Sequence, residues 1–198
     1  MPRLAVINAE GSRTLDHLVG TLGLNWAGGR PDMPRSEGYY QELETAGVKA
    51  STVASAIEIN RPVNLKKCLR ALEFCDGVVR NVSDQEIMDA KARVGAGARV
   101  RARQRRERGR AKRLREEGVI APGDRVVCVL TGHQLKDPTA TVAYHGTDEA
   151  NFQKVLGSRG VRTAEFANRP VVVANDLDEI IRAISQHDAA AGATQAAP

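Results

Sequence analysis

The chain has 198 residues, 42% of them hydrophobic and 4% aromatic, which is typical of a soluble globular protein of one domain or slightly more. No apolar run approaches about 18 residues, which excludes a membrane span, and the first residues lack the pattern of an export signal. The three cysteines (Cys68, Cys75 and Cys128) are an odd number without a C-x-x-C pair. This usage disfavours a disulfide framework or zinc ribbon and favours a cytoplasmic protein.

The positive charge is concentrated in one segment. Residues 99–110 (RVRARQRRERGR) contain seven arginines and one glutamate, and subtracting this +6 from the net charge of +5 leaves −1 for the rest of the chain. Such a run is typical of an arm that binds RNA or phosphate, or of a solvated helix face that has no partner. A third interpretation arises from the family resemblance described below.

Short β-like runs alternate with helical patterns, which is typical of α/β architecture. The predicted strands are residues 4–8, 78–82, 125–130 and 170–175. Strands that are closely followed by helices favour a parallel sheet with helices on both faces. Ligands bind at the carboxyl ends of such strands, which directs attention to Thr131 and Gly132, directly after the strongest predicted strand.

The helical patterns come with recognisable start and stop signals. Apolar residues at helical spacing predict helices over residues 15–22, 65–72 and 177–184, and residues 114–118 are expected to end a helix. Asn64 is expected to cap the second helix, and Ser83 and Glu86 form a capping box that opens another. Residues 23–37 are expected to form a loop, 121–124 a turn and 188–198 a disordered tail.

Five stretches together resemble the C-terminal half of threonine synthase, a pyridoxal 5'-phosphate (PLP) enzyme of fold type II, the tryptophan-synthase-β class. They are residues 2–11, 51–73, 77–91, 114–145 and 157–184. TGHQLKDP (131–138), behind a predicted strand, is the most specific of them. The resemblance implies that residues 1–187 are the C-terminal portion of such an enzyme, with an incomplete parallel sheet.

The resemblance also implies an activity and cofactor-binding residues. Family members convert O-phosphohomoserine and water into threonine and phosphate in threonine biosynthesis, with PLP as the electron sink. Thr131 matches the residue whose hydroxyl hydrogen-bonds the pyridine nitrogen of PLP, although a Thr-Gly pair also commonly forms a simple strand-end turn. Ala54 and Ala56 match a segment beside the cofactor ring, and ordinary helix packing is the alternative role for both alanines.

Two parts of the family's machinery have no counterpart in this sequence. The family's Schiff-base lysine lies in a Ser-Phe-Lys-Asp type motif that is absent here, and Lys136 belongs to the TGHQLKDP block instead. The glycine-rich loop that holds the PLP phosphate is also absent, and Gly28-Gly29 does not match it. We therefore expect no catalytic residue in this chain and no activity from it alone. An upstream N-terminal half would be needed to supply both parts, and the partners that the resemblance implies are such a half or a second copy of the chain.

The arginine run coincides with a family motif close to Gly-Cys-Glu-Pro-Ala-Ser-Ala-Ala-Ser-Val that lines the cofactor pocket. Residues 99–108 can be encoded by a DNA sequence that, when it is read one base later, encodes the first nine residues of that motif in order. We therefore interpret residues 99–110 as a local frameshift within a threonine-synthase gene. Burying seven guanidinium groups unpaired would be costly, so the segment is expected to stay exposed. Without the missing half of the fold, sheet edges and apolar faces are also left uncovered, so the isolated chain is expected to be poorly soluble or marginally stable.

Two other classes of protein remain as alternatives. An arginine-rich nucleic-acid-binding protein is disfavoured by the charge of −1 elsewhere and by the lack of stacking aromatics near the run. Another fold type II enzyme, such as threonine dehydratase, is disfavoured by TGHQLKDP. The four histidines (His17, His133, His145 and His187) lack metal-ligand spacing, so no metal site is expected and His133 is interpreted as structural.

Overall fold

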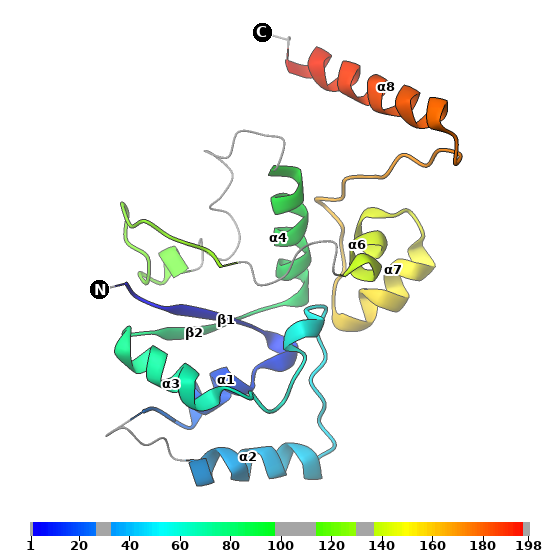
Figure 1. Cartoon of the computed structure of the whole chain (residues 1–198). Helices are drawn as coiled ribbons and strands as arrows, with labels where there is room; N and C mark the ends of the chain where they lie inside the picture. Colours follow the sequence, from blue (N-terminus) through cyan, green and yellow to red (C-terminus); the bar gives the residue numbers. More distant parts are fainter. Residues whose placement is uncertain (1, 27–32, 98–113, 130–136, 196–198) are drawn as a thin grey trace.

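The computed structural model describes residues 2–26, 33–97, 114–129 and 137–195 of this α/β chain (Figure 1). Two strands are present among these residues, β1 (Ala5–Ala9) and β2 (Val78–Val82). The helices are α1 (Thr14–Asp16, continued by a π turn over His17–Thr21), α2 (Met33–Thr45), α3 (Leu65–Phe74), α4 (Asp84–Gly97), α6 (Pro138–His145), α7 (Glu149–Val155) and α8 (Leu177–Gln195). Short 3-10 turns cover Glu10–Ser12, Ser55–Ile57 and Gly157–Arg159.

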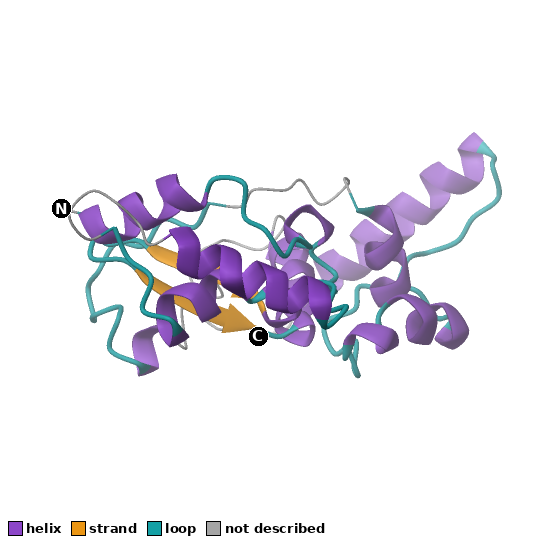
Figure 2. Ribbon diagram, turned by 90° about the horizontal axis from the view of Figure 1, so that it is seen from below, coloured by secondary structure: helices purple, strands orange, loops and turns teal. Residues whose placement is uncertain are grey.

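The two strands form a parallel pair, with Ala5 opposite Val78 and Ala9 opposite Val82. Parallel strands need a long crossover connection, and here α1, α2 and α3 lie in the chain between them. Figure 2 shows the strand pair lying among the helices. The prediction of a parallel α/β arrangement is therefore confirmed for the first and second predicted strands.

The predictions of a third and a fourth strand are wrong for the residues that the structure describes. Residues 125–129 and 170–175 carry no strand pairing, and Leu130 lies outside the described residues. Their valines are exposed, Val127 to 86% and Val172 to 90%. β-propensity reflects packing on a half-buried pleated surface, so a valine run without a neighbouring strand or a covering helix has nothing to hold it in a sheet.

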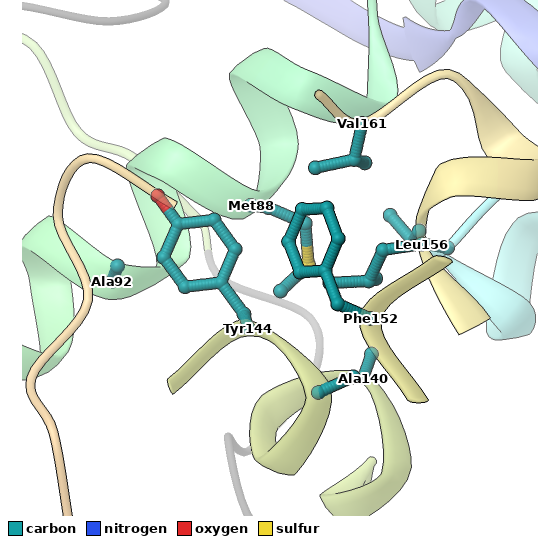
Figure 3. Close-up of a cluster of buried hydrophobic side chains, with 9 residues drawn as sticks. Met88, Ala92, Ala140, Tyr144, Phe152, Leu156 and Val161 are labelled. Carbon is teal, nitrogen blue, oxygen red and sulfur yellow. The ribbon is translucent and has the colours of Figure 1, made fainter. Parts of the chain in front are cut away.

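The buried side chains form two separate clusters. The first lies between the strand pair and α1, α2 and α3, and it includes Leu15, Leu18, Leu69 and Val79. The second joins α4, α6 and α7 around Tyr144 and Leu156, both of which have no exposed surface (Figure 3). Fully buried apolar residues of this size each contribute about 1.5–3 kcal/mol to folding.

The capping box and the turn that were predicted from local signals are confirmed, and the predicted capping role of Asn64 is not. The capping box is confirmed, because Glu86 accepts a hydrogen bond from Ser83 N at 2.8 Å and Ser83 Oγ accepts one from Glu86 N at 3.3 Å. Asn64 does precede α3, but its side chain makes no capping hydrogen bond. The turn at 121–124 is confirmed by the hydrogen bond from Asp124 N to Ala121 O at 3.2 Å.

Three helical regions differ from the sequence prediction. α2 begins at Met33, so it includes the last residues of the predicted loop 23–37. α6 and α7 were not predicted at all. α8 continues to Gln195, so the helix includes most of the residues predicted to form a disordered tail (188–198).

The apolar face of α8 is exposed to solvent. Leu177, Ile181 and Ile184 are 69%, 52% and 55% exposed, and Figure 1 shows α8 projecting away from the other helices. Together with the exposed valines, these side chains leave large apolar groups on the surface at several places in the described part of the chain. No helix in the described part of the chain is long and apolar enough to cross a membrane.

Reducing this apolar surface is expected to improve solubility. The triple variant Val127→Thr, Val172→Thr and Ile181→Gln should raise the soluble fraction and reduce self-association, while the free energy of unfolding changes by no more than about 0.5 kcal/mol per site. Light scattering after size-exclusion chromatography measures the association. Val79→Thr, which alters a side chain only 6% exposed, serves as a destabilising control. A cooperative, monomeric melt of the unaltered chain would contradict this expectation.

Candidate ligand site at the carboxyl edge of the sheet

Residues 51–58 form a loop that joins the carboxyl ends of both strands. Ser51 N donates a hydrogen bond to Gly11 O at 2.9 Å, just beyond the end of β1. Thr52 Oγ1 donates to Asp84 Oδ1 at 2.5 Å, just beyond the end of β2. Thr52 is 1% exposed and Asp84 8% exposed. The loop therefore lies where parallel α/β sheets usually bind their ligands.

Glycine is required at position 11 by the close approach of the loop backbone. A Cβ atom at Gly11 would lie 1.7 Å from the carbonyl oxygen of Ser51, which is well inside van der Waals contact. Only a residue without a side chain allows the chain after β1 to run beside the loop. Gly11 therefore determines how closely the loop approaches the sheet edge.

The conformation of the loop is stabilised by its own polar contacts. Thr52 Oγ1 accepts a hydrogen bond from Ala54 N at 3.2 Å, and Glu58 Oε1 accepts one from Thr52 N at 2.9 Å. Ser12 Oγ donates to the carbonyl oxygens of Ile57 at 2.6 Å and Ile59 at 2.9 Å. Because these bonds involve loop backbone, the loop is held in place without help from a ligand.

Two of the three predicted cofactor-binding residues lie in the described part of the chain, and the third does not. Ala54 is half-buried directly before the 3-10 turn Ser55–Ile57, and Ala56 is exposed within that turn. Neither alanine lies in a regular α-helix, so helix packing does not account for them. Thr131, like His133 and the arginine run 99–110, lies outside the described residues. The structure therefore brings Ala54 and Ala56 to the sheet edge and leaves the role of Thr131 a prediction.

Sequence reasoning missed Gly11, Thr52 and Asp84. Asp84 lies two residues beyond the end of a predicted strand, and a polar residue close to such an end is a recognisable signal of a functional edge. Its carboxylate also lies at the first residue of α4, where the helix dipole stabilises negative charge. Thr52 is 32 residues away along the chain, and no local pattern indicates that the two side chains meet.

A second polar cluster holds residues 161–169 against α4 and α6. Tyr144 Oη donates to Asp89 Oδ1 at 2.6 Å and accepts a hydrogen bond from Phe166 N at 3.4 Å. Burial, together with the hydrogen bond to Asp89, raises the pKa of Tyr144. The Arg93 guanidinium lies 3.7 Å from the centroid of the Phe166 ring. These contacts make Tyr144 a structural residue at the centre of its core.

His145 contributes to the same cluster as a hydrogen-bond acceptor. Its Nδ1 accepts a hydrogen bond from Asn168 N at 2.8 Å, which requires that nitrogen to be unprotonated. Burial lowers the pKa of His145, and the nearby Lys91 and Arg169 lower it further.

Stability is therefore expected to fall as the pH drops below about 6.5, the ordinary histidine value. The unfolded chain binds the His145 proton more readily than the folded chain does. The stabilisation that neutral His145 provides is thus fully present above the unfolded-state pKa of about 6.5. It is lost as the pH falls towards the lowered pKa of the folded state. Urea unfolding at several pH values between 5 and 8 measures this, and His145→Gln should flatten the dependence. An unchanged pH profile in the variant would contradict the assignment.

The described residues provide neither a metal site nor a complete PLP site. No group of three or more His, Cys, Asp or Glu residues among them could hold a metal ion, and the three cysteines are free thiols. The small side chains of Ala54 and Ala56 fit beside a flat ring. However, the loop 51–58 contains no lysine that could form a Schiff base. This loop therefore offers no covalent attachment point for PLP.

A parallel strand pair with a structured loop at its carboxyl edge defines part of an α/β protein. In sequence, the chain is threonine-synthase-like. It is 39% identical to threonine synthase of Methanocaldococcus jannaschii over 93 residues, which is 46% of this chain and 23% of that protein. It is 34% identical to chloroplastic threonine synthase 2 of Arabidopsis thaliana over 138 residues, which is 69% of this chain and 25% of that protein.

A threonine synthase of a Bacillus species is 32% identical over 126 residues, which is 60% of this chain and 36% of that protein. The chain thus spans about a quarter of the length of the first two curated relatives, 23% and 25% respectively. No protein-family model and no solved structure matches it.

Proposed function

We propose that this chain forms one wall of a PLP-dependent threonine-synthase active site of fold type II. The reaction would convert O-phosphohomoserine and water into threonine and phosphate. The position of the loop 51–58 at the carboxyl edge of β1 and β2, in a threonine-synthase-like sequence, is the observation that carries this proposal. Fold type II and PLP follow from the same resemblance, and a cytoplasmic location follows from the cysteine usage.

The residues of the chain have binding and positioning roles in this proposal. PLP, when bound, supplies an electron sink for carbanion chemistry. Ala54 and Ala56 leave room for its ring, and the Thr131 hydroxyl hydrogen-bonds the pyridine nitrogen without holding it protonated. The buried pair of Thr52 and Asp84 keeps the loop at the sheet edge. The Schiff-base lysine and the phosphate-binding loop come from outside these 198 residues, so the chain alone is inactive.

The proposal is tested with a chimera. The part of the Methanocaldococcus jannaschii threonine synthase that precedes its matched segment is fused to this chain, and phosphate release from O-phosphohomoserine is measured with PLP present. The 198-residue chain alone should release no phosphate. A chimera in which residues 99–108 are replaced by the family motif should release phosphate, and the chimera that retains the arginine run should be far less active.

Two variants of the active chimera separate the assigned roles. Thr131→Ala should lower kcat and alter the absorbance of bound PLP, whereas Lys49→Gln, at an exposed position outside the loop, should leave both unchanged. A chimera that folds but turns over no O-phosphohomoserine would contradict the proposal. Release of 2-oxobutyrate and ammonium from threonine would instead indicate a dehydratase.

A further inference from the structure

The C-terminal arm, defined as residues 170–195, begins directly after two residues that contact the end of α6. No hydrogen bond joins residues 170–186 to the rest of the described chain, and neither of the two buried clusters described includes a residue of the arm. Figure 1 shows α8, the helical part of the arm, projecting away from the other helices. We propose that His145, Asn168 and Arg169 form a pH-sensitive latch that releases the base of the arm at acidic pH.

Hydrogen bonds hold Asn168 and Arg169 against the end of α6. His145 Nδ1 accepts a hydrogen bond from Asn168 N at 2.8 Å. The Arg169 guanidinium donates to the carbonyl oxygen of His145 at 3.3 Å and also to that of Gly146. Because Asn168 and Arg169 are both exposed, these hydrogen bonds rather than burial fix their position.

Only neutral His145 can make the contact with Asn168. A neutral imidazole has one unprotonated nitrogen that accepts a hydrogen bond, whereas an imidazolium ion carries a proton on both nitrogens and only donates. Turning the protonated ring therefore does not restore an acceptor. Protonation of His145 breaks the hydrogen bond from Asn168 N and sets two N–H groups against each other.

The groups around His145 keep the latch closed at neutral pH. Burial lowers the pKa of His145, and the positive charges of Lys91 on α4 and of Arg169 lower it further. Tyr144, the preceding residue of α6, packs its ring edge-on against the imidazole with 5.3 Å between the centroids, and its hydroxyl donates to Asp89. The imidazolium that forms at lower pH repels the Arg169 guanidinium, which weakens the second contact of the latch as well.

The segment before the latch has contacts that acid does not remove. Phe166 packs against the buried cluster of α4, α6 and α7, and the Arg93 guanidinium lies 3.7 Å from the centroid of its ring. Phe166 N also donates to Tyr144 Oη at 3.4 Å. None of these groups gains a proton as the pH falls from 8 to 5. Release therefore begins at Asn168 and lengthens the tether that carries α8.

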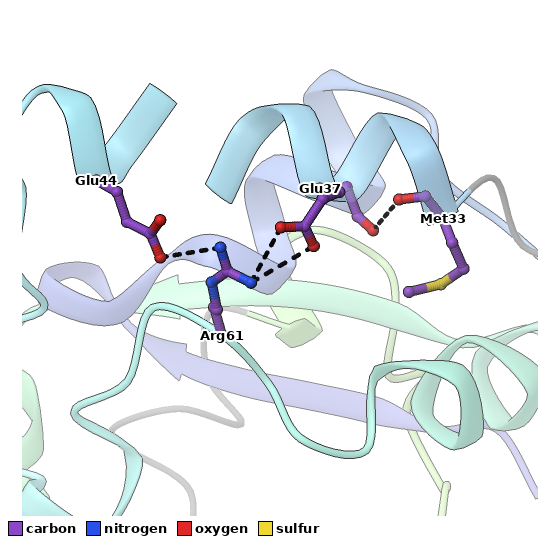
Figure 4. A network of polar contacts seen from close by, with 5 residues as sticks. Met33, Glu37, Glu44 and Arg61 are labelled. Atoms are coloured by element: carbon purple, nitrogen blue, oxygen red, sulfur yellow. Dashed lines mark hydrogen bonds and ion pairs between the residues drawn. The ribbon is translucent and has the colours of Figure 1, made fainter. Parts of the chain in front are cut away.

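α2 is a surface helix whose attachment does not respond to pH in this range, so it serves as an internal reference. The Arg61 guanidinium forms ion pairs with Glu37 at 3.1 Å and Glu44 at 2.9 Å, both on α2 (Figure 4). Ion pairs between guanidinium and carboxylate groups ordinarily persist between pH 5 and 8. The latch contains no residue of the loop 51–58, so the inference does not depend on the proposed threonine-synthase activity.

Amide hydrogen exchange of the full chain at pH 8 and pH 5 tests the latch, with labelling times scaled to the intrinsic exchange rate at each pH. The protection of the Asn168 amide, followed by NMR, should fall by about tenfold or more at pH 5, as expected for the loss of one hydrogen bond. Protection in α2 and in α7 should stay unchanged. An equal loss of protection in α7 would show general unfolding and would overturn the proposal.

Three histidine variants separate a latch from a merely structural role. His145→Asn places a carbonyl oxygen near the position of Nδ1 and does not titrate, so the Asn168 amide should stay protected at both pH values. His145→Leu removes the acceptor, and protection should be low at both. His17→Asn alters a histidine that stacks on Tyr39 with 4.2 Å between the ring centroids, and it should respond to pH as the unaltered chain does.

The remaining outcomes decide against the latch. The proposal is overturned if the protection of the Asn168 amide in the unaltered chain is the same at pH 8 and pH 5. It is also overturned if His145→Asn keeps the pH dependence, or if His17→Asn abolishes it. Protection of α7 in each variant confirms that the comparison is made between folded proteins.

Discussion

Replacing Tyr144 by alanine is expected to lower the free energy of unfolding by about 3–5 kcal/mol, the range found for truncation of large buried aromatic residues. Tyr144 has no exposed surface and lies among Met88, Phe152 and Leu156 in the core formed by α4, α6 and α7. The truncation leaves a cavity and also removes the hydrogen bond to Asp89. Urea unfolding followed by circular dichroism measures the loss.

Two variants on the same helix make the result interpretable. Tyr144→Phe should cost about 1–3 kcal/mol, because it removes only the hydroxyl and leaves the Phe166 N–H without its acceptor. Val142→Ala alters an α6 side chain that is 62% exposed, and it should change stability by less than about 0.5 kcal/mol. Equal effects for Tyr144→Ala and Val142→Ala would show that this second core does not form.

Replacing Gly11 by alanine is expected to displace the loop 51–58 from the carboxyl edge of the sheet. The new Cβ would lie 1.7 Å from Ser51 O and 2.7 Å from Ser51 C, and both are backbone atoms that cannot move aside as a flexible side chain can. The hydrogen bond from Ser51 N to Gly11 O would be lost with the contact. We expect a destabilisation of about 3 kcal/mol, at the upper end of the usual range for overpacking.

Gly38→Ala is the matched control for the Gly11 variant. A Cβ at Gly38, inside α2, meets nothing within 4 Å. Because alanine favours helix over glycine, this change should stabilise the chain by roughly 0.5–1 kcal/mol. Amide hydrogen exchange of residues 51–58 should rise in the Gly11 variant only. Unchanged protection of the loop in Gly11→Ala would contradict the proposed arrangement of the edge.

Local signals predicted the parts of the fold that local physics determines. The capping box of Ser83 and Glu86 depends on neighbouring residues only, and the structure contains it. The helices that the prediction missed also carried signals. Pro138 occupies the first position of α6, and the carboxylate of Asp148 caps α7 by accepting a hydrogen bond from Asn151 N at 3.0 Å. These boundaries could have been predicted.

Features that depend on distant partners could not be predicted. A strand at 125–130 or 170–175 requires a neighbour to complete its hydrogen bonds, and a valine run does not reveal whether one is present. The pairing of Thr52 with Asp84 and the close approach at Gly11 each join segments more than 30 residues apart. The cofactor roles of Ala54 and Ala56 rest on resemblance to a family, because nothing in their own chemistry indicates PLP.

The nucleotide sequence across codons 95–112 tests most directly the claim that this chain descends from threonine synthase. Read one base later, the codons for residues 99–108 should spell Gly-Cys-Glu-Pro-Ala-Ser-Ala-Ala-Ser, so that the arginine run replaces the motif that lines the family's cofactor pocket. Codons that cannot be read as this motif in the shifted frame would contradict the account. The arginine segment would then be genuine, and a nucleic-acid-binding role for it would become the stronger hypothesis.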